Sequence, residues 1–444
     1  MAERRIPVAC VQTQAVDRTG FQEAWPRFLA LVDSAGTSGA KLIVLPEGTV
    51  PSYVVGTTPV PAELIQRTES DLAELATRHG AVIVYGTARI HEGRQFNSAS
   101  VIGPDGRDLG FAAKQFLWHF DRKWFERGAT LDPIDTPVGR LGVMVCADNR
   151  IPTIPNTLVE RGAELLVLPT AWVTSGRDPG NLENAQADLM INVRAHENGV
   201  PFVACNKAGI EEQSVAYCGK SAIVAADGHL IAQGGESEET VLLGEVDVGS
   251  SPERTHTTLA ATIDEGFKPL DKMRIAFTLE TDPVKLERYR KLAELEDAPV
   301  LISPDDGPPR IVERDGVRYG ITGTEAFCNP RGLVDARLAG VDLFVWDLHG
   351  KAAWRVSYGR TRAMELRAWM IGFDRDRDRA VVIDPEGAVI AGTFDDLKIA
   401  AFSYDRSRSA NGLVAPFTDA LAGLRNAEAI RARGIEQSLV APRG

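Results

Sequence analysis

The sequence predicts an α/β fold, because apolar segments of strand length alternate with segments that carry apolar residues at helical spacing. The strand-like segments of the first half are RIPVACVQT, AKLIVLPE, AVIVYGTA, NSASVIG, LGVMVCAD, AELLVLPT and VPFVACN. Several are almost entirely apolar, as is typical of strands that are buried on both faces. A shorter series of similar segments follows in the C-terminal part, which indicates that the same fold occurs twice.

Three helices are predicted between these strands. Residues 21–35 place apolar side chains three or four positions apart, which is the spacing of one helix face. Residues 64–79 and 181–198 follow the same rule. Each is followed directly by a glycine, Gly80 or Gly199, and glycine commonly ends a helix because it adopts a left-handed backbone without strain.

Composition places the chain among ordinary globular proteins. Its 444 residues are 44% hydrophobic and 25% charged, and this length is enough for two domains. The net charge of −12 offers no basic surface for nucleic acid. No apolar run approaches the roughly 20 residues of a membrane span. We therefore expect neither nucleic acid nor a membrane as a partner.

The N-terminal residues and the cysteine pattern favour a reducing compartment. The start, MAERRIPVACVQT, reads as a few charged residues followed by a strand rather than as a signal peptide. The five cysteines are an odd number, are scattered along the chain and include no CxxC pair, so they indicate no disulfide framework. We expect a cytoplasmic protein.

An internal repeat relates the two parts of the chain. A constant offset of 178 residues places Gly142 on Gly320, Cys146 on Thr324 and the segment RGAELLVLP on AGVDLFVWD. Further on, the sequence RAHE at 194–197 corresponds to RAME at 362–365. A period this long indicates two copies of one domain. The second copy has no room for a counterpart of about residues 51–130. The alternative is that two α/β segments look alike because they share a composition.

Three residues have the chemistry of a nucleophilic site. Cys146 follows a predicted strand, and Glu47 follows another, in LPEGTVPSY; the carboxyl ends of strands are where α/β proteins place their sites. Lys114 lies in the apolar setting GFAAKQFLWHF, where an ammonium needs an anionic partner. A cysteine nucleophile requires such a base and such a cation. The alternatives are a structural thiol, an exposed turn glutamate and a surface lysine.

Taken together, these segments resemble the nitrilase superfamily. The matching pieces are KLIVLPEG, the lysine segment that closes on Phe125 and Gly128, and GRLGVMVCADNRIP, in the family's order Glu, Lys, Cys. Further matches are GAELLVLPTAW, RAHENGVPFVACNKAG and GKSAIVAADG, so the resemblance covers about residues 5–248. It implies a four-layer αββα sandwich, followed here by a shortened, degenerate copy of the same fold.

The resemblance also implies catalytic roles. Cys146 would be the nucleophile, Glu47 the general base, and Lys114 would stabilise an oxyanion together with the backbone N–H of Ala147. Asp121 stands where many members carry a second catalytic glutamate. The aspartate side chain is shorter than that of glutamate, so the resemblance alone does not establish Asp121 as a fourth catalytic residue.

Substrate-binding candidates are Tyr53, His119 and Trp172, which lie beside the triad segments; each could equally belong to the core. Alanine follows the cysteine here, whereas true nitrilases usually have tryptophan. The pattern Cys-x-Asp therefore resembles the amidase and carbamoylase branches, and predicts hydrolysis of a small linear amide or N-carbamoyl compound through a thioester. The alternatives are nitrile hydrolysis and a non-catalytic scaffold or ligand-binding protein. We expect no metal and no cofactor.

Domain boundaries follow from the repeat and from composition. We predict a catalytic domain at 1–248, a linker at 249–272, a degenerate non-catalytic copy at 273–404 and a tail at 405–444 that returns to the first domain. In the second copy Thr324 replaces the cysteine, Asp305 is at best a shortened counterpart of Glu47, and the lysine segment has none. Members of the family pair through helices beside the site, so the second copy is predicted to form an intrachain pseudo-dimer. A homo-oligomer stays an open alternative.

Overall fold

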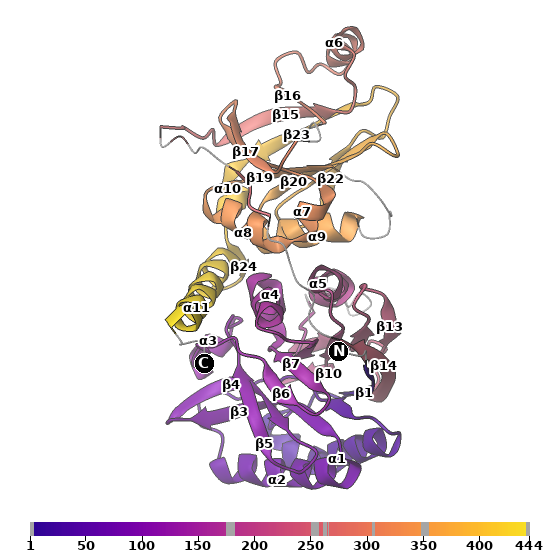
Figure 1. The fold of residues 1–444 in the computed structure, drawn as a ribbon, viewed down its shortest axis with the longest axis vertical. Coiled ribbons are helices and arrows are strands. Elements are labelled where there is room, and N and C mark those ends of the chain that lie inside the picture. The colour runs from indigo at the N-terminus through magenta and orange to yellow at the C-terminus, as the bar shows by residue number, and fades with distance from the viewer. Residues whose placement is uncertain are drawn as a thin grey trace. The chain divides into compact units, whose positions relative to one another are not determined.

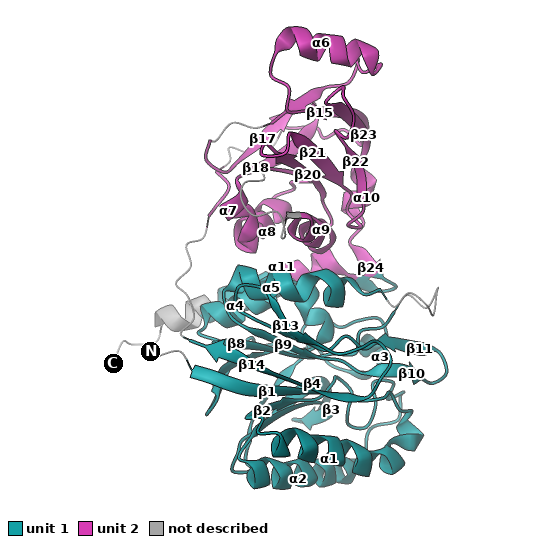
Figure 2. Cartoon of the chain, turned by 90° about the vertical axis from the view of Figure 1, so that its right-hand side faces the viewer, with its two compact units in different colours: residues 1–254, 415–418, 426–444 teal, residues 255–414, 419–425 magenta. Residues whose placement is uncertain are grey.

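Two compact units make up the chain (Figure 2). The computed structural model describes residues 4–174, 183–249, 257–260, 264, 266–303, 307–347 and 355–440, with side chains to residue 434. Unit 1 comprises residues 1–254, 415–418 and 426–444, and unit 2 comprises residues 255–414 and 419–425. The catalytic candidates all belong to unit 1.

Unit 1 contains two six-stranded sheets. The first has the order β14 (Thr240–Val248), β1 (Arg4–Gln12), β2 (Leu42–Val44), β3 (Val82–His91), β4 (Arg94–Ile102), β5 (Asp108–Ala113). The second has the order β13 (Leu230–Gln233), β12 (Ala222–Val224), β9 (Phe202–Cys205), β8 (Leu165–Pro169), β7 (Gly139–Val143), β6 (Ile134–Thr136). A small ribbon, β10 (Ala208–Glu211) with β11 (Val215–Cys218), is separate. In each large sheet the central strands are parallel and the outer ones antiparallel.

Helices cover both outer faces of the two sheets (Figure 1). Helices α1 (Phe21–Thr37) and α2 (Ala62–His79) contact the first sheet, and α4 (Thr153–Glu160) and α5 (Ile191–Asn198) contact the second. The sheets contact each other through β1, β2, β3, β8 and β9. The predicted four-layer αββα sandwich is therefore confirmed. Shorter helical turns are η1 (Arg18–Gly20), α3 (Asp121–Trp124), η2 (Cys146–Arg150) and the π-helical turn η3 (Gln186–Met190).

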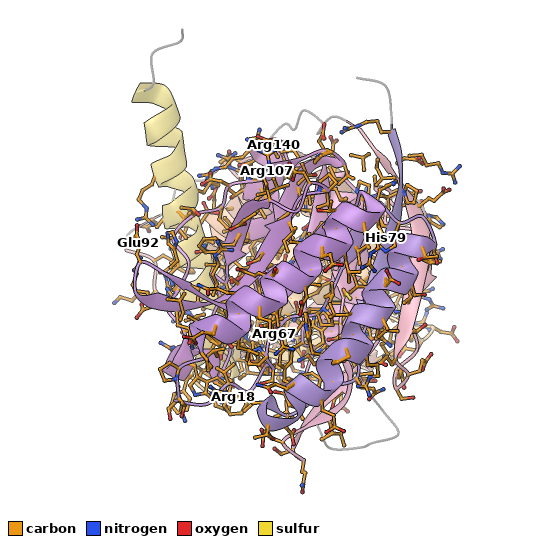
Figure 3. All side chains as sticks on the ribbon, turned by 90° about the horizontal axis from the view of Figure 1, so that it is seen from below. Arg18, Arg67, His79, Glu92, Arg107 and Arg140 are labelled. Atoms are coloured by element: carbon orange, nitrogen blue, oxygen red, sulfur yellow. The ribbon has the colours of Figure 1, made fainter. Side chains whose placement is uncertain are left out.

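Helices α1 and α2 lie side by side over the first sheet (Figure 3). The apolar positions that predicted α1 are its buried face: Phe21, Ala24, Trp25, Phe28, Val32 and Ala35. Gly80 ends α2 with φ +57°, and Gly199 ends α5 with φ +60°, as predicted. The third predicted helix differs in part, because its described portion is a π-helical turn followed by α5; residues 181 and 182 lie outside the described residues.

Unit 2 contains a three-stranded and a six-stranded sheet. The first has the order β16 (Val300–Ile302), β15 (Lys272–Thr278), β23 (Ile399–Asp405). The second has the order β17 (Arg310–Arg314), β18 (Val317–Thr322), β19 (Leu343–Asp347), β20 (Trp369–Asp374), β21 (Arg379–Ile383), β22 (Val389–Gly392). Its helices are α6 (Pro283–Leu292), α7 (Thr324–Cys328), α8 (Pro330–Leu338), α9 (Arg355–Leu366) and α10 (Arg406–Ala410).

The larger sheet of unit 2 repeats the second sheet of unit 1 strand for strand. In both, an antiparallel edge strand precedes three parallel strands, and two antiparallel strands follow. Both sheets carry a register shift in the last pair, at Ile223/Val224 and at Val382/Ile383. Strands β7 and β8 map onto β18 and β19 at the offset of 178 residues that the sequence shows.

The smaller sheet of unit 2 matches only β14, β1 and β2, since β23, β15 and β16 have the same pairing directions. In this sheet no described strand corresponds to β3, β4 or β5. A buried ion pair also recurs: Arg194 binds Glu197 and the Asn149 carbonyl, and Arg362 binds Glu365 and the Phe327 carbonyl. These correspondences support the predicted internal duplication. Asp305 lies outside the described residues.

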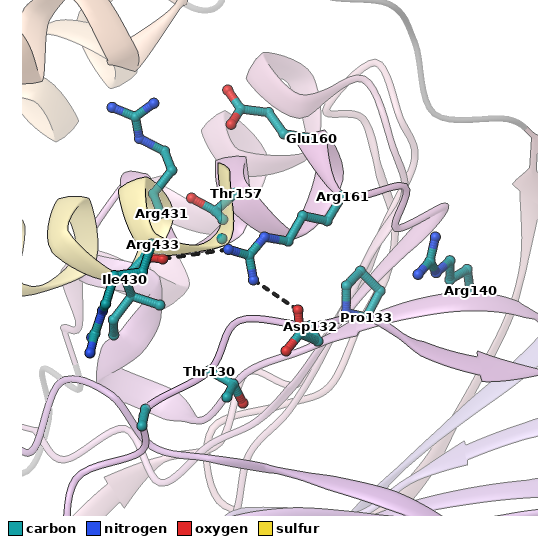
Figure 4. Close-up of a pocket in the computed structure, with 12 residues that line it drawn as sticks. Thr130, Asp132, Pro133, Arg140, Thr157, Glu160, Arg161, Ile430, Arg431 and Arg433 are labelled. Carbon is teal, nitrogen blue, oxygen red and sulfur yellow. Dashed lines mark hydrogen bonds and ion pairs between the residues drawn. The ribbon is translucent and has the colours of Figure 1, made fainter. Parts of the chain in front are cut away.

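The tail consists of the strand pair β24 (Leu413–Ala415) and β25 (Thr418–Asp419) and the helix α11 (Ala420–Val440). Within unit 1, Thr153 of α4 donates a hydrogen bond to Glu428 (2.7 Å). Arg161 binds Asp132 (2.8 Å) and the Ile430 carbonyl (3.5 Å) at the edge of a cavity of about 580 Å³ (Figure 4). Among the described residues, no helix is long and apolar enough to cross a membrane.

Candidate active site

Lys114 is the centre of a buried cluster of charges. It follows β5, and its backbone N–H donates to the Asn97 carbonyl (2.8 Å). Its Nζ lies 2.7 Å from Glu47 Oε1 and 2.6 Å from Asp121 Oδ2, and all three side chains are fully buried. Burial alone would lower the pKa of Lys114, but the charges of Asp121 and Glu47 raise it well above its usual value. The ammonium is therefore charged, and the predicted alternative of a surface lysine is wrong.

Glu47 lies in the turn that follows β2. Its N–H donates to the Thr170 carbonyl (3.2 Å), and its Oε1 also accepts a hydrogen bond from Asn97 Nδ2 (2.7 Å). The other oxygen, Oε2, is buried and has no hydrogen-bond partner among the described residues. The turn packs tightly on β3, since a Cβ at Gly86 would lie 2.5 Å from the Glu47 Cα. Glu47 is thus no exposed turn residue, and it keeps one oxygen free to accept a proton.

Cys146 is the first residue of η2, and only 6% of it is exposed. Its φ of +44° is in the left-handed region, which is unfavourable for a residue with a Cβ and is found mostly where a site requires it. Burial and, next, the charge of Glu47 raise the pKa of the thiol well above its usual value, against the lowering effect of Lys114. The resting thiol is therefore protonated, so it needs a base at the moment of attack.

Asp148 ties the nucleophile to the lysine loop. Its Oδ1 accepts hydrogen bonds from the N–H groups of Gln115 (2.9 Å) and Phe116 (2.7 Å), and its Oδ2 accepts one from Val145 (3.0 Å). Burial raises the pKa of Asp148 to about 6, although these hydrogen bonds oppose the rise. One carboxylate thus fixes the residues that directly follow Lys114 against the residue that precedes Cys146.

The predicted fourth acid and Tyr53 lie close to Lys114. Asp121 reaches the ammonium because α3 begins at this residue, while the nearby Glu126 is exposed. The ring of Tyr53 is 5.8 Å from Lys114 Nζ, and Tyr53 is 3% exposed. Burial, and then the charges of Asp121 and Glu47, raise the pKa of Tyr53 well above its usual value.

The other predicted contact residues are Ala147, Trp172 and His119, and in the part of the chain that the structure describes none of them hydrogen-bonds to the charged cluster. Ala147 follows the nucleophile in η2 and is 1% exposed. Trp172 is also 1% exposed; its N–H donates to Asn206 Oδ1 (2.8 Å), and its indole Nε1 has no hydrogen-bond partner among the described residues. His119 is half-buried against the Phe120 ring, with centroids 4.0 Å apart.

Sequence reasoning missed Asn97 and Arg150. Asn97 sits within a predicted strand, and only the structure shows that its amide faces Glu47. Arg150 lies four residues after the nucleophile, with its guanidinium 4.9 Å from the centre of the Trp118 ring. Its Nε is buried without a hydrogen-bond partner among the described residues. Burial lowers the pKa of Arg150 to about 10, opposed by the charge of Cys146.

The geometry combines a thiol, a base with a free oxygen, and a cation with a spare donor. An ammonium has three N–H groups, and two of those on Lys114 are directed to carboxylates, so the third can bind a developing oxyanion. Among the described residues no group of three His, Cys, Asp or Glu could hold a metal ion. The fold and this set of residues are those of a hydrolase.

Comparison with known proteins identifies the family. The family model described as carbon-nitrogen hydrolase matches residues 7–253, so the chain belongs to the carbon-nitrogen hydrolase family and is a carbon–nitrogen hydrolase. An omega-amidase of Xenopus laevis is 32% identical over 50% of this chain and 82% of its own length. A nitrilase of Pyrococcus abyssi is 31% identical over 49% and 81%. Among solved structures, a carbon-nitrogen hydrolase from Helicobacter pylori G27 is 25% identical, covering 55% of this chain and 89% of that chain, with a TM-score of 0.49.

Proposed function

We propose that unit 1 hydrolyses a small linear amide or N-carbamoyl compound through a thioester on Cys146, releasing ammonia or an amine. The observation that carries this proposal is the buried cluster in which Lys114 joins Glu47 and Asp121. Such a cluster is costly to bury. It serves a reaction in which a thiol must lose its proton and an oxyanion must be stabilised in the same place.

The first half of the reaction forms the thioester. Cys146 Sγ attacks the carbonyl carbon while the thiol proton passes to the free oxygen of Glu47. The oxyanion of the tetrahedral species accepts hydrogen bonds from Lys114 and from the Ala147 N–H. The carbon–nitrogen bond then breaks as the leaving nitrogen takes the proton from Glu47. An acyl thioester and one neutral amine or ammonia result.

The second half is hydrolysis of the thioester. Glu47 takes a proton from water as the water oxygen attacks the same carbon. The carbon–sulfur bond breaks, the acid leaves, and the proton returns to the sulfur. Asp121 has no proton to move in this scheme; it keeps Lys114 charged and in place.

An amide substrate that carries an anionic group fits Arg150. The Arg150 Nε is buried, and the guanidinium has no carboxylate partner among the described residues, which is costly; a substrate anion would remove that cost. The relatives named omega-amidase support an amide as the substrate, whereas those named nitrilase keep nitrile hydrolysis as the second candidate. Ala147, which replaces the usual nitrilase tryptophan, favours the amide.

Paired substrates test both points. We expect ammonia release from succinamate to exceed release from the corresponding nitrile, 3-cyanopropanoate, and from the methyl ester of succinamate. Arg150→Met should lower kcat/KM for succinamate by about 10²-fold or more, which is the effect of removing a charged hydrogen bond, and should change the ester much less. Preference for the nitrile would favour the second candidate. Equal losses on both amides would remove Arg150 from substrate recognition.

A further inference from the structure

Four tail residues of unit 1, Ala415–Thr418, contact the segment that carries Lys114 and Asp121 through Phe417 and Thr418; we call the four residues the C-terminal clamp. The Oγ1 of Thr418 accepts a hydrogen bond from the His119 N–H (2.9 Å). The Thr418 hydroxyl donates to the Pro416 carbonyl (3.3 Å), so its hydrogen is directed away from His119. Arg122 donates a hydrogen bond to the Phe417 carbonyl. Thr418 is 1% exposed, which makes the contact part of the interior of unit 1.

The contact falls on the one strained residue of this loop. His119 has φ +39°, a left-handed conformation that costs free energy in a residue with a Cβ. The loop N–H groups before it are held by Asp148, and that of Trp118 by Asp121 Oδ2 (2.9 Å). The turn then closes with the Asp121 N–H donating to the Trp118 carbonyl (2.8 Å). The His119 N–H, in the middle of this turn, is held by Thr418.

We propose that the C-terminal clamp sets the conformation of the catalytic loop, with Thr418 as a positioning residue for Asp121 and, through it, for Lys114. The inference rests on the proposed function of the site. Without the hydroxyl, the half-buried His119 N–H would lose its acceptor, and the left-handed conformation would lose its support. The turn would relax, and the Asp121 carboxylate would leave the position 2.6 Å from the ammonium.

The clamp lies outside the part of the chain that the family model matches, which ends at residue 253. Residues on both sides of it, up to 414 and from 419, belong to unit 2. The active-site loop of unit 1 is therefore completed by a segment of unit 1 that the chain supplies only after residues 255–414.

The experiment compares hydroxyl-deleting variants in the full-length protein. Thr418→Val and Thr418→Ala remove the acceptor, and Thr418→Ser keeps it. Thr393→Val is the matched control: Thr393 is fully buried, and its Oγ1 accepts the Ala380 N–H at 2.9 Å, but it belongs to unit 2. Two quantities are measured for each variant: hydrogen exchange of the peptide that spans residues 115–122, and kcat and KM with succinamate.

We expect Thr418→Val and Thr418→Ala to exchange the loop amides about tenfold faster or more, the effect of one lost buried hydrogen bond. In both, kcat should fall by about the same factor while KM changes little, since Lys114 and Asp121 act on the transition state. Thr418→Ser should restore both values to within about twofold, and Thr393→Val should match the wild type in both. The alanine variant serves if the valine variant does not fold.

Thr418 variants with wild-type loop exchange and wild-type kcat would overturn the clamp. A rise in KM alone, or no rescue by Thr418→Ser, would also overturn it, since the hydroxyl would then not position the loop. Hydrogen exchange needs no turnover, so it tests the clamp even if no amide is hydrolysed. If Cys146→Ala abolishes amide hydrolysis while the Thr418 variants behave as wild type, the proposed function stands and the clamp fails.

Discussion

At Lys114, two carboxylates share one ammonium in a setting that water does not reach. Each of the three charges is tolerated because of the others: a buried cation between two anions is far less costly than any of them alone. The same closeness keeps the lysine protonated and leaves one of its N–H groups for substrate. Structural stability and catalytic readiness therefore depend on the same two contacts, and substitutions can separate them.

Lys114→Met should lower both the catalytic activity and the stability of the protein. We expect kcat to fall by about 10²–10³-fold, as for other removed oxyanion donors, and the free energy of unfolding to fall by about 3–5 kcal/mol because two carboxylates are left unpaired. The double variant Lys114→Met/Asp121→Asn should regain part of the stability and none of the activity. Urea unfolding and steady-state kinetics measure the two. A stable, nearly active Lys114→Met protein would refute the charge arrangement.

In the proposed reaction, Glu47 and Cys146 make contributions that substitutions can separate. Cys146→Ala should abolish turnover with little change in unfolding temperature, because the thiol adds reactivity rather than volume. Glu47→Gln should lower kcat much more than it raises KM, and should trap an acyl adduct wherever loss of the base slows deacylation more than attack. Mass spectrometry of intact protein after mixing with substrate detects this adduct. An adduct on any other cysteine would move the nucleophile away from Cys146.

The sequence predicts the elements that carry the site better than it predicts the contacts within it. Glu47, Lys114 and Cys146 could be found because each follows a strand or lies in a conspicuously apolar setting. Asn97, Arg150 and Thr418 could not, since a polar residue in a strand, a turn or a tail has many ordinary uses. Their importance depends on which atoms they face, and that is decided by packing between distant segments. The π-helical turn before α5 was missed for the same reason.

At the scale of elements, the loop between β5 and α3 and the turn η2 are joined by the Asp148 carboxylate. Such a junction is sensitive to acid, because a protonated carboxyl cannot accept all three N–H groups equally well. Its pKa is raised from 3.8 to about 6, so the folded protein binds this proton more tightly than the unfolded chain does. The stability that this group contributes is full below about pH 3.8 and is lost as the pH rises through about 6.

Catalytic activity should depend on pH in the opposite direction from this stability contribution. As the pH falls through about 6, Asp148 gains its proton, the junction loosens and kcat/KM declines. Infrared difference spectra between pH 8 and pH 5 should show a protonated-carboxyl band that Asp148→Asn lacks, and its midpoint should match that of the activity profile. If the band appears only below pH 4, Asp148 is not the group that limits activity in acid.

At the scale of the whole molecule, the catalytic unit is discontinuous in sequence. Its first stretch ends at Arg254, and it is completed by residues 415–418 and the later part of α11. Unit 2 repeats part of the fold of unit 1 but has Thr324 where the repeat aligns Cys146. We therefore expect Thr324→Ala to leave kcat and KM for succinamate unchanged, which steady-state kinetics will show. A large loss would give the second unit chemistry of its own.

Cutting the chain tests whether the first stretch of unit 1 needs a covalent link to the tail or only contact with it. With a protease site introduced between residues 249 and 257, the nicked protein should keep most of its activity, because the second fragment still supplies the clamp and the Glu428 contact to Thr153. The isolated fragment 1–254 should show kcat at least about tenfold lower and should associate with itself or aggregate, because it exposes surface that the tail covers. Size-exclusion chromatography with activity assays distinguishes the two. Full activity in a monomeric fragment would contradict this.

The position of the clamp after the long stretch 255–414 also has a consequence for biosynthesis. The ribosome produces the nucleophile, base and lysine first, and residues 255–414 must then be made before the clamp exists. At about 5–20 residues per second, that interval lasts roughly 10 to 30 seconds. During this time unit 1 can fold around a reactive thiol without holding its loop in the working conformation. We therefore expect full activity to appear only after residues 415–418 have been made and have reached the loop.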